Sequence, residues 1–201
     1  EVGRRNVGDG LAERIDGGQP ARPHDQRDVV GLDAREFAEP GGGGLSVYDP
    51  SRPPESRIVT YTTGDGLAND SVFAIYEDSA GDVWIGTSGG LNRMRNGKLV
   101  KLTVDQGLFD NRIFQILEDG RGQFWLSSNK GVFRAAIADL NAVADGFKST
   151  VETHAYGRVD GMGSNQCNGA SQPAGWRRAS GQLVFPTVGG LALIDPGDLR
   201  T

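Results

Sequence analysis

A stretch of about twenty residues occurs twice in this chain. The first copy begins at Val72, and the second begins 41 positions later, at Ile113. Residues 72–91 and 113–132 share a pattern of two short apolar runs split by a polar, glycine-containing turn. A weaker third copy, at residues 181–191, keeps glycines, a threonine and a leucine of the first. Self-similarity at about 40 residues is typical of β-propellers and solenoids, because each repeat is one structural unit.

The repeated runs predict β-strands. They are four to seven residues long, too short for helices, and they are rich in Val, Ile, Phe, Tyr and Trp. Residues 83–85 are continuously apolar, which favours a strand buried on both faces. Propeller blades meet this condition, because each four-stranded sheet packs between two neighbours. The predicted fold class is therefore all-β, with four-stranded antiparallel sheets arranged as the blades of a β-propeller.

The spacing of the strands predicts an incomplete propeller over residues 42–201. We expect a half blade at 42–63, a blade at 71–103, a blade at 113–156 and a partial blade at 174–195. Propellers close with about four to eight blades, so this set is too small to form a ring. The chain is expected to be a piece of a longer protein; the alternative is an obligate partner in an assembly.

Within these blades, the expected strands span residues 45–48, 57–61, 72–76, 83–86, 91–94, 99–102, 113–119, 150–156, 175–179, 183–187 and 191–194. Asn96-Gly97 predicts a hairpin turn, because both residues tolerate a positive φ. Residues 137–148 interrupt the second blade and predict one or two helical turns that stop at Gly146.

The first 41 residues do not share the repeat. They are rich in Arg, Asp, Glu, Gly and Ala, contain one aromatic residue, Phe37, and show no sustained periodicity. This composition predicts a weakly folded or disordered arm. An alternative hypothesis is a segment read in the wrong frame, because the repeat pattern begins abruptly at Gly42.

Composition excludes several kinds of site. The net charge of −5 argues against nucleic acid as a partner. The single cysteine, Cys167, excludes an internal disulfide, and the two histidines exclude a multi-histidine metal site. We therefore expect neither a metal nor a cofactor. No run reaches the roughly 18 apolar residues of a membrane span, and no targeting signal is present in this sequence, which begins with Glu1.

The motif Asp-x-x-Gly-x-x-Trp recurs at the same place in both full blades, as Asp78, Gly81 and Trp84 and as Asp119, Gly122 and Trp125. A cation site at the aspartates is one interpretation. The structural interpretation is favoured: the aspartate caps the turn, the glycine takes a strained φ, and the tryptophan packs between blades.

The loops that enter each inner strand carry the candidate ligand-binding residues. In a propeller such a loop reaches the rim of the central channel, where polar groups suit a hydroxyl-rich ligand. The alternative is that these side chains only fix their own loop. Residues 165–176, the least repeat-like segment, form either a ligand-facing loop or a ring-closing one. The candidates are Asn69, Asp70, Asn111, Arg112, Asn165, Asn168 and Gln172.

The repeat resembles the two-component regulator propeller repeat: an apolar run, Glu-Asp, Gly, and then Val-Trp-Ile-Gly-Thr-x-Gly-Gly-Leu, with Asp-Gly-Leu before it. Residues 167–196 look like the last repeat of such a region. The resemblance implies a periplasmic sensor propeller of a hybrid histidine kinase or related receptor. It also implies a carbohydrate-type ligand, further blades and a downstream β-sandwich as partners, and a kinase or diguanylate cyclase output. A homodimer is a further expected arrangement.

Two other functions compete with a sensor. A protein-interaction propeller would use its faces as a docking platform. A propeller lyase or glycosidase would need an acid/base pair that breaks the repeat symmetry, and the acidic pairs at residues 77–78 and 118–119 are equivalent instead. We therefore expect no catalytic residue and no enzymatic activity in this chain.

Overall fold

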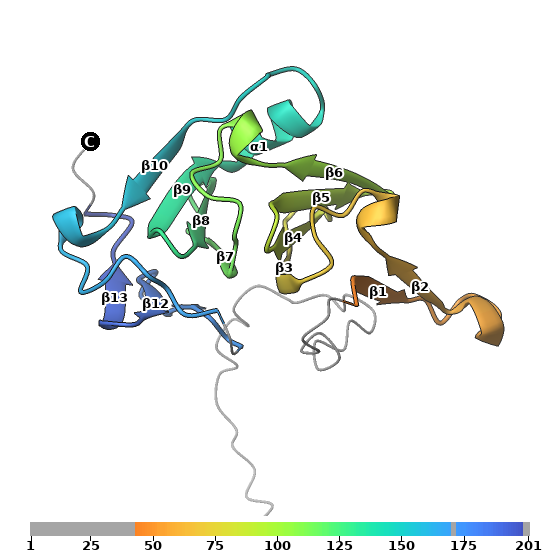
Figure 1. Ribbon diagram of the computed structural model, residues 1–201, viewed down its shortest axis with the longest axis horizontal. Helices are drawn as coiled ribbons and strands as arrows, with labels where there is room; N and C mark the ends of the chain where they lie inside the picture. The colour runs from red at the N-terminus through yellow and green to blue at the C-terminus, as the bar shows by residue number, and fades with distance from the viewer. Residues whose placement is uncertain (1–42, 170–171, 199–201) are drawn as a thin grey trace, which may run out of the picture.

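The computed structural model describes residues 43–169 and 172–198, and four antiparallel sheets lie side by side in an arc (Figure 1). In Figure 1, β3 and β7 lie on the concave side of this arc, and β6 and β10 lie on its outer side. The expectation for residues 1–41 falls outside the described residues. The all-β propeller fold class is confirmed, and within the described residues the sheets do not close into a ring.

Each sheet is a meander whose strands pair in chain order. The first sheet contains β1 (Leu45–Tyr48) and β2 (Ile58–Tyr61). The second contains β3 (Val72–Glu77), β4 (Val83–Thr87), β5 (Leu91–Arg95) and β6 (Lys98–Leu102). The third contains β7 (Gln115–Glu118), β8 (Gln123–Ser127), β9 (Val132–Ala136) and β10 (Thr153–Tyr156). The fourth contains β11 (Trp176–Arg177), β12 (Leu183–Thr187) and β13 (Gly190–Ile194).

Short 3-10 helices and one α-helix connect these strands. Three of the 3-10 helices follow the outer strands β2, β6 and β10, at Thr63–Asp65, Val104–Gln106 and Arg158–Asp160. A fourth, Pro54–Ser56, lies between β1 and β2. The predicted helical insertion is α1 (Ile137–Ala144), and Gly146 follows it with a φ of +79°. In the described part of the chain, none of the helices has the length and apolar character that a membrane crossing requires.

The hydrophobic core is divided among the gaps between neighbouring sheets. Trp84 and Ile85 are both fully buried, and they point to opposite faces of the second sheet. Trp84 packs toward the third sheet, where its ring meets Phe124 edge-on at 5.3 Å, and Ile85 packs toward the first. Trp125 likewise packs toward the fourth sheet. Burial on both faces explains why residues 83–85 lack the polar alternation of a half-exposed strand.

The favoured structural interpretation of the Asp-x-x-Gly-x-x-Trp motif agrees with the geometry. Asp78 Oδ1 accepts hydrogen bonds from the backbone N–H groups of Ala80 (2.9 Å) and Asp82 (3.0 Å), and Gly81 has a φ of +83°. The second oxygen accepts from Trp84 Nε1 at 2.8 Å, a bond that the sequence pattern did not predict. The aspartate therefore fixes both the turn and the orientation of the indole.

The second copy of the motif repeats this arrangement. Asp119 accepts from the backbone of Arg121 (2.7 Å) and Gln123 (3.2 Å) and from Trp125 Nε1 (3.1 Å). Asn96 and Gly97 have φ values of +51° and +75°, as the predicted hairpin turn between β5 and β6 requires.

Three strands are shorter than predicted, two of them because the backbone bonds outside its own sheet. Ile113 N–H donates to the Thr87 carbonyl of the preceding sheet (2.9 Å), so β7 begins at Gln115. Val151 N–H donates to the Gln106 carbonyl (2.8 Å), so β10 begins only at Thr153. The inner strand of the fourth sheet shrinks from the predicted 175–179 to β11, because Arg178 already bonds to Gln182 in the following turn.

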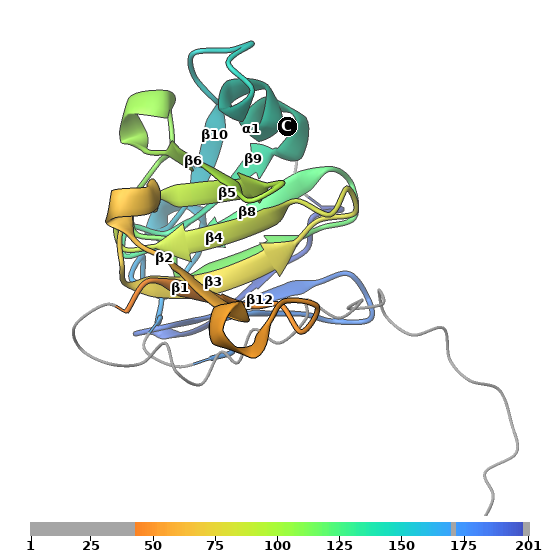
Figure 2. The ribbon, with the colours of Figure 1, turned by 90° about the vertical axis from the view of Figure 1, so that its right-hand side faces the viewer.

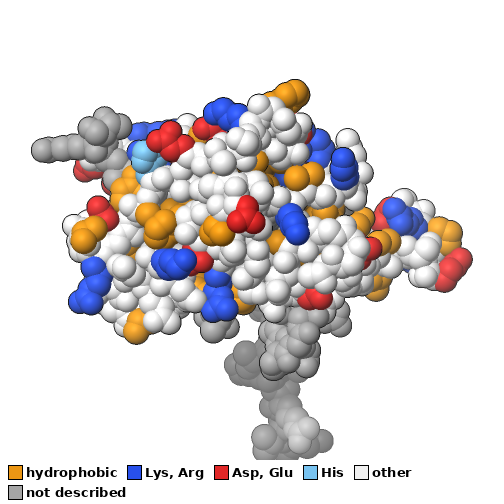
Figure 3. Space-filling view, turned by 45° about the horizontal axis from the view of Figure 1, so that its top comes forward, with side chains coloured by type: hydrophobic (Ala, Val, Ile, Leu, Met, Phe, Trp, Pro, Cys, Tyr) orange, Lys and Arg blue, Asp and Glu red, His pale blue; other side chains and the backbone are white. Residues whose placement is uncertain are grey.

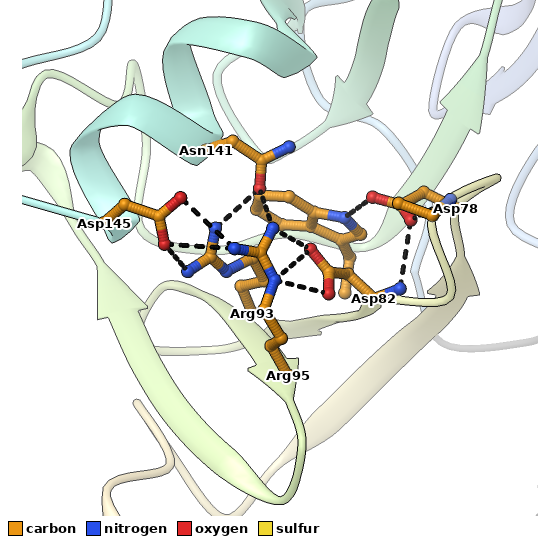
Figure 4. Close-up of polar contacts among 8 residues, drawn as sticks. Asp78, Asp82, Arg93, Arg95, Asn141 and Asp145 are labelled. Carbon is orange, nitrogen blue, oxygen red and sulfur yellow. Dashed lines mark hydrogen bonds and ion pairs between the residues drawn. The ribbon is translucent and has the colours of Figure 1, made fainter. Parts of the chain in front are cut away.

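Helix α1 fastens the third sheet to the second (Figure 4). It lies beside the outer part of both sheets, above β6 and β9 in Figure 2. Arg93 of β5 donates to Asn141 Oδ1 (2.7 Å) and pairs with Asp145, which follows the helix. Arg95 pairs with Asp82 (2.5 Å) and with Asp145 (3.2 Å). The insertion thus contributes a polar clamp between two blades.

Candidate ligand-binding site

Phe73 stands at an irregularity in the innermost strand of the second sheet. The pairing of β3 with β4 shifts register between Val72 and Ala74, which leaves Phe73 as the extra residue of a β-bulge. A bulge turns a side chain away from the regular face of a sheet. The ring of Phe73 meets that of Phe114, the equivalent residue of the next repeat, edge-on at 5.3 Å and 72°.

The segment that follows the 3-10 helix Arg158–Asp160 passes between the third and fourth sheets. The backbone N–H of Cys167 donates to the Ser128 carbonyl (3.1 Å), and that of Asn168 donates to the Pro186 carbonyl (2.9 Å). Val188 N–H in turn donates to the Gln166 carbonyl (3.0 Å). These backbone bonds place Gln166 and Asn168 beside the aromatic pair.

Gly169 allows the same segment to lie directly on an aromatic ring. A Cβ atom at this position would stand 2.0 Å from Cδ1 of Phe114. Phe114 is itself buried, so its ring has little room to move away. Any larger residue at position 169 would displace either the ring or the loop.

These elements line an open cavity of about 430 Å³ at the surface. Its size falls within the range of small-molecule sites. Within the described part of the chain, its lining combines two aromatic rings with three amide side chains, a thiol and a glycine and contains no charged side chain: Phe73, Phe114, Asn129, Gln166, Cys167, Asn168 and Gly169. Aromatic carbon and uncharged hydrogen-bonding groups together suit a neutral polar ligand.

The thiol in this cavity is not an activated nucleophile. Cys167 is buried, and desolvation raises its pKa to about 11. The group therefore stays protonated at neutral pH, and only the thiolate reacts readily. Among the described residues, no group of three His, Cys, Asp or Glu side chains gathers as a metal site.

Among the described residues, the side chains of four predicted ligand-binding residues hydrogen-bond only within their own loops. Asp70, Asn111 and Asn165 occupy equivalent places, and each accepts a hydrogen bond from the backbone N–H seven residues earlier, at 2.7, 2.8 and 2.6 Å. Asn69 accepts from Ser71 N–H at 2.9 Å. These contacts match the loop-fixing alternative, and ligand binding by these four residues stays a prediction.

The other three predicted ligand-binding residues differ in their position relative to the cavity. Asn168 lines the cavity. Gln172 adjoins it, because its Nε2 donates to the Phe73 carbonyl at the bulge. Arg112 is exposed and does not line the cavity. The structure therefore brings Asn168 and Gln172 together with Phe73 and leaves the remaining candidates in the loops.

Of the seven lining residues, sequence reasoning named only Asn168 as a ligand candidate. Positions 166, 167 and 169 lay within the special segment 165–176, and Phe73, Phe114 and Asn129 were missed. The two phenylalanines carry a usable signal, since they recur at the repeat spacing in an inner strand. Asn129 lies in the turn between β8 and β9, which gave no sign of proximity to residue 166. Only the packing of the third sheet against the fourth brings these two amides together.

The fold and the cavity define a β-propeller segment with a small-molecule-sized site between successive blades. Residues 66–89 and 107–130 match the family model described as two component regulator propeller. The recognition made from the repeat is thereby confirmed for these residues, which match the two-component regulator propeller repeat. A search of curated proteins found no match.

Solved structures share this fold. The extracellular domain described as that of the hybrid two component system BT3049 from B. thetaiotaomicron is 21% identical, with a TM-score of 0.61, over 77% of this chain and 19% of that one. The extracellular domain of BT4673 from the same organism, described as a hybrid system, is 22% identical with a TM-score of 0.65. A second BT4673 structure, described as a one component system, is 23% identical with a TM-score of 0.63.

Both BT4673 alignments cover 80% of this chain and 22% of that one, so the present chain spans about a fifth of each of these domains.

Proposed function

We propose that this chain is part of the ligand-sensing propeller of a two-component signal-transduction receptor. The observation that carries the proposal is the 430 Å³ cavity, in which two repeat-equivalent aromatic rings meet a loop that departs from the repeat. The repeat places Phe73 and Phe114 in consecutive blades, and the special loop closes the space beside them. A ligand there would contact two blades at once.

The ligand that we propose is carbohydrate-type. Sugars combine an apolar C–H face with hydroxyl groups, and the cavity combines aromatic rings with amide side chains. Occupancy would be relayed to a histidine kinase or diguanylate cyclase domain. The proposed location is periplasmic, in the sensor region of an inner-membrane receptor, which the similarity to extracellular domains supports.

A protein-interaction function is the second candidate, and the outer face of the fourth sheet favours it. Trp176, Leu191 and Leu193 are 64%, 68% and 57% exposed on this face. The proposed partners are the remaining blades and a downstream β-sandwich of the same receptor, or a second copy of the chain. On the side of the molecule seen in Figure 3, by contrast, basic and acidic side chains are interspersed.

The sensor proposal is tested in the full-length receptor by comparing Gly169→Ala with Gly43→Ala. A Cβ atom at Gly169 would collide with Phe114, whereas one at Gly43 would meet nothing within 4 Å. We expect a saccharide panel to raise the Tm of the wild type and of Gly43→Ala but not that of Gly169→Ala. A ligand at about 100 times its Kd stabilises the bound state by about 2.7 kcal/mol, which such a scan detects.

Signalling by the wild-type receptor and by both variants is measured in cells with a reporter of the receptor's output. Loss of saccharide-dependent output in Gly169→Ala alone supports the proposal. An equal response in both variants contradicts a ligand in this cavity.

A further inference from the structure

The amide groups in the cavity are free to bind a ligand. Among the residues that the structure describes, the side-chain amides of Asn129, Gln166 and Asn168 have no hydrogen-bond partner. This separates them from Asn111 and Asn165, whose side-chain carbonyls accept bonds from their own loops. Each free amide offers both donors and an acceptor, which is the complement that a hydroxyl group needs.

The lining residues that the structure describes carry no charge, although charged groups lie close by in the sequence. Lys130 follows Asn129 directly, but its Nζ points to Asp110 Oδ1 at 3.6 Å and is not part of the cavity wall. A carboxylate or sulfate in the cavity would lose hydration without gaining an ion pair. Arg and Lys are the side chains that repay this cost.

The aromatic ring at the bulge can serve as a stacking surface. Phe73 is only partly buried, and its ring meets that of Phe114 edge-to-face at 72° instead of stacking on it, so at most one face of Phe73 is in contact with Phe114. Gln172 holds the Phe73 carbonyl and so fixes the backbone that carries the ring. A rigid, partly open ring binds the C–H face of a sugar at low entropic cost.

From these observations, and resting on the proposed function, we infer that the cavity binds an uncharged sugar residue stacked on Phe73, with its hydroxyls held by Asn129, Gln166 and Asn168. The site selects against uronates and sulfated sugars. The selectivity comes from the lack of a positively charged side chain in the described lining, because the amides can hydrogen-bond to the hydroxyls of charged and uncharged sugars alike.

The test uses the full-length receptor and pairs of oligosaccharides that differ only at C6. Galactotetraose is compared with tetragalacturonate, and cellotetraose with its C6-oxidised counterpart, by isothermal titration calorimetry. For the configuration that binds, we expect the neutral member to bind at least tenfold more tightly. Equal or tighter binding of a carboxylate member, abolished by Gly169→Ala, would keep the sensor site and overturn the inference. Failure of every saccharide to bind overturns both.

Two substitutions locate the selectivity. Phe73→Leu keeps apolar volume but removes the ring, and we expect it to weaken neutral binding about tenfold. The matched control is Phe147→Leu, because Phe147 is 85% exposed on the insertion and does not line the cavity. Gln166→Lys places a cation at an exposed lining position, and we expect it to strengthen binding of the carboxylate member at least fivefold. Unchanged affinities in Phe73→Leu and in Gln166→Lys overturn the assignment.

Discussion

Single aspartates organise the inner turn of each full blade. Asp78 and Asp119 use one oxygen for two backbone N–H groups and the other for the indole of a fully buried tryptophan. A buried indole N–H without a partner is costly, because its hydration is lost and not replaced. The aspartate therefore couples a local turn to the packing between blades.

Replacement of Asp78 by alanine should lower the free energy of unfolding by about 2–4 kcal/mol, since it leaves the indole N–H of Trp84 and two backbone donors unpaired. Urea titration followed by fluorescence measures the loss. Asp105→Ala is the matched control, because Asp105 is exposed and makes no side-chain hydrogen bond among the described residues. Similar losses in both variants would show that the indole bond contributes nothing.

The insertion of α1 into the third blade adds a contact that the repeat alone does not provide. The guanidinium of Arg93 is almost fully buried, with 4% of its side chain exposed, and its charge is balanced by Asp145. Hydrogen bonding by Arg93, followed by the positive charges of Arg93 and Arg95, lowers the pKa of Asp145 below its ordinary value of 3.8. The clamp therefore depends on an ionised Asp145.

This clamp should make stability depend on pH. A carboxylate whose pKa is lower in the folded state stabilises the fold above its unfolded pKa of about 3.9 and loses this effect as pH falls through the folded pKa. Asp145→Asn should therefore lower the Tm by a few degrees at pH 7, and the difference from wild type should shrink at pH 3 and below. Thermal unfolding at both pH values measures it.

Asp139→Asn is the control on the same helix, because among the described residues Asp139 pairs only with Lys148, whose side chain is 51% exposed. A Tm difference for Asp145→Asn that is the same at pH 7 and pH 3 would contradict an ionic clamp.

At the scale of the whole molecule, and within the described residues, each sheet except the last has one face covered by the sheet that follows it. Trp176, Val184 and Leu191 occupy the places of Tyr76, Trp84 and Leu91 in the second sheet. Those second-sheet side chains pack against the third sheet. Trp176 and Leu191, however, are mostly exposed. The outer face of the fourth sheet thus has the residue pattern of a blade interface, and an exposed apolar face of this kind promotes association.

The double variant Leu191→Thr/Leu193→Thr should shift the isolated 201-residue chain toward the monomer. Threonine keeps β propensity while it removes apolar surface, so stability should change by less than about 0.5 kcal/mol per site. Sedimentation velocity over a range of concentrations measures the shift, with Phe147→Thr as a control for a single exposed aromatic residue. Self-association that persists in the double variant would show that another surface causes it.

Much of this architecture could be predicted from the repeat. The strand runs, the capped turn at Asp78, the Asn96-Gly97 hairpin and the helical insertion all depend on residues close together in the chain, so periodicity and turn chemistry reveal them. The first residues of β7 and β10 could not be predicted, because Ile113 and Val151, which precede these strands, bond to backbone groups outside their own sheets.

The cavity and the clamp depend on contacts between blades. Phe73 and Gly169 are almost a hundred positions apart, and Arg93 and Asp145 are 52 apart. The sequence pattern indicated polar loops but could not separate Asn168, which faces the cavity, from Asn165, which bonds to its own loop. Local chemistry is the same for both residues; the packing of the third sheet against the fourth, through side chains distant in sequence, makes them different.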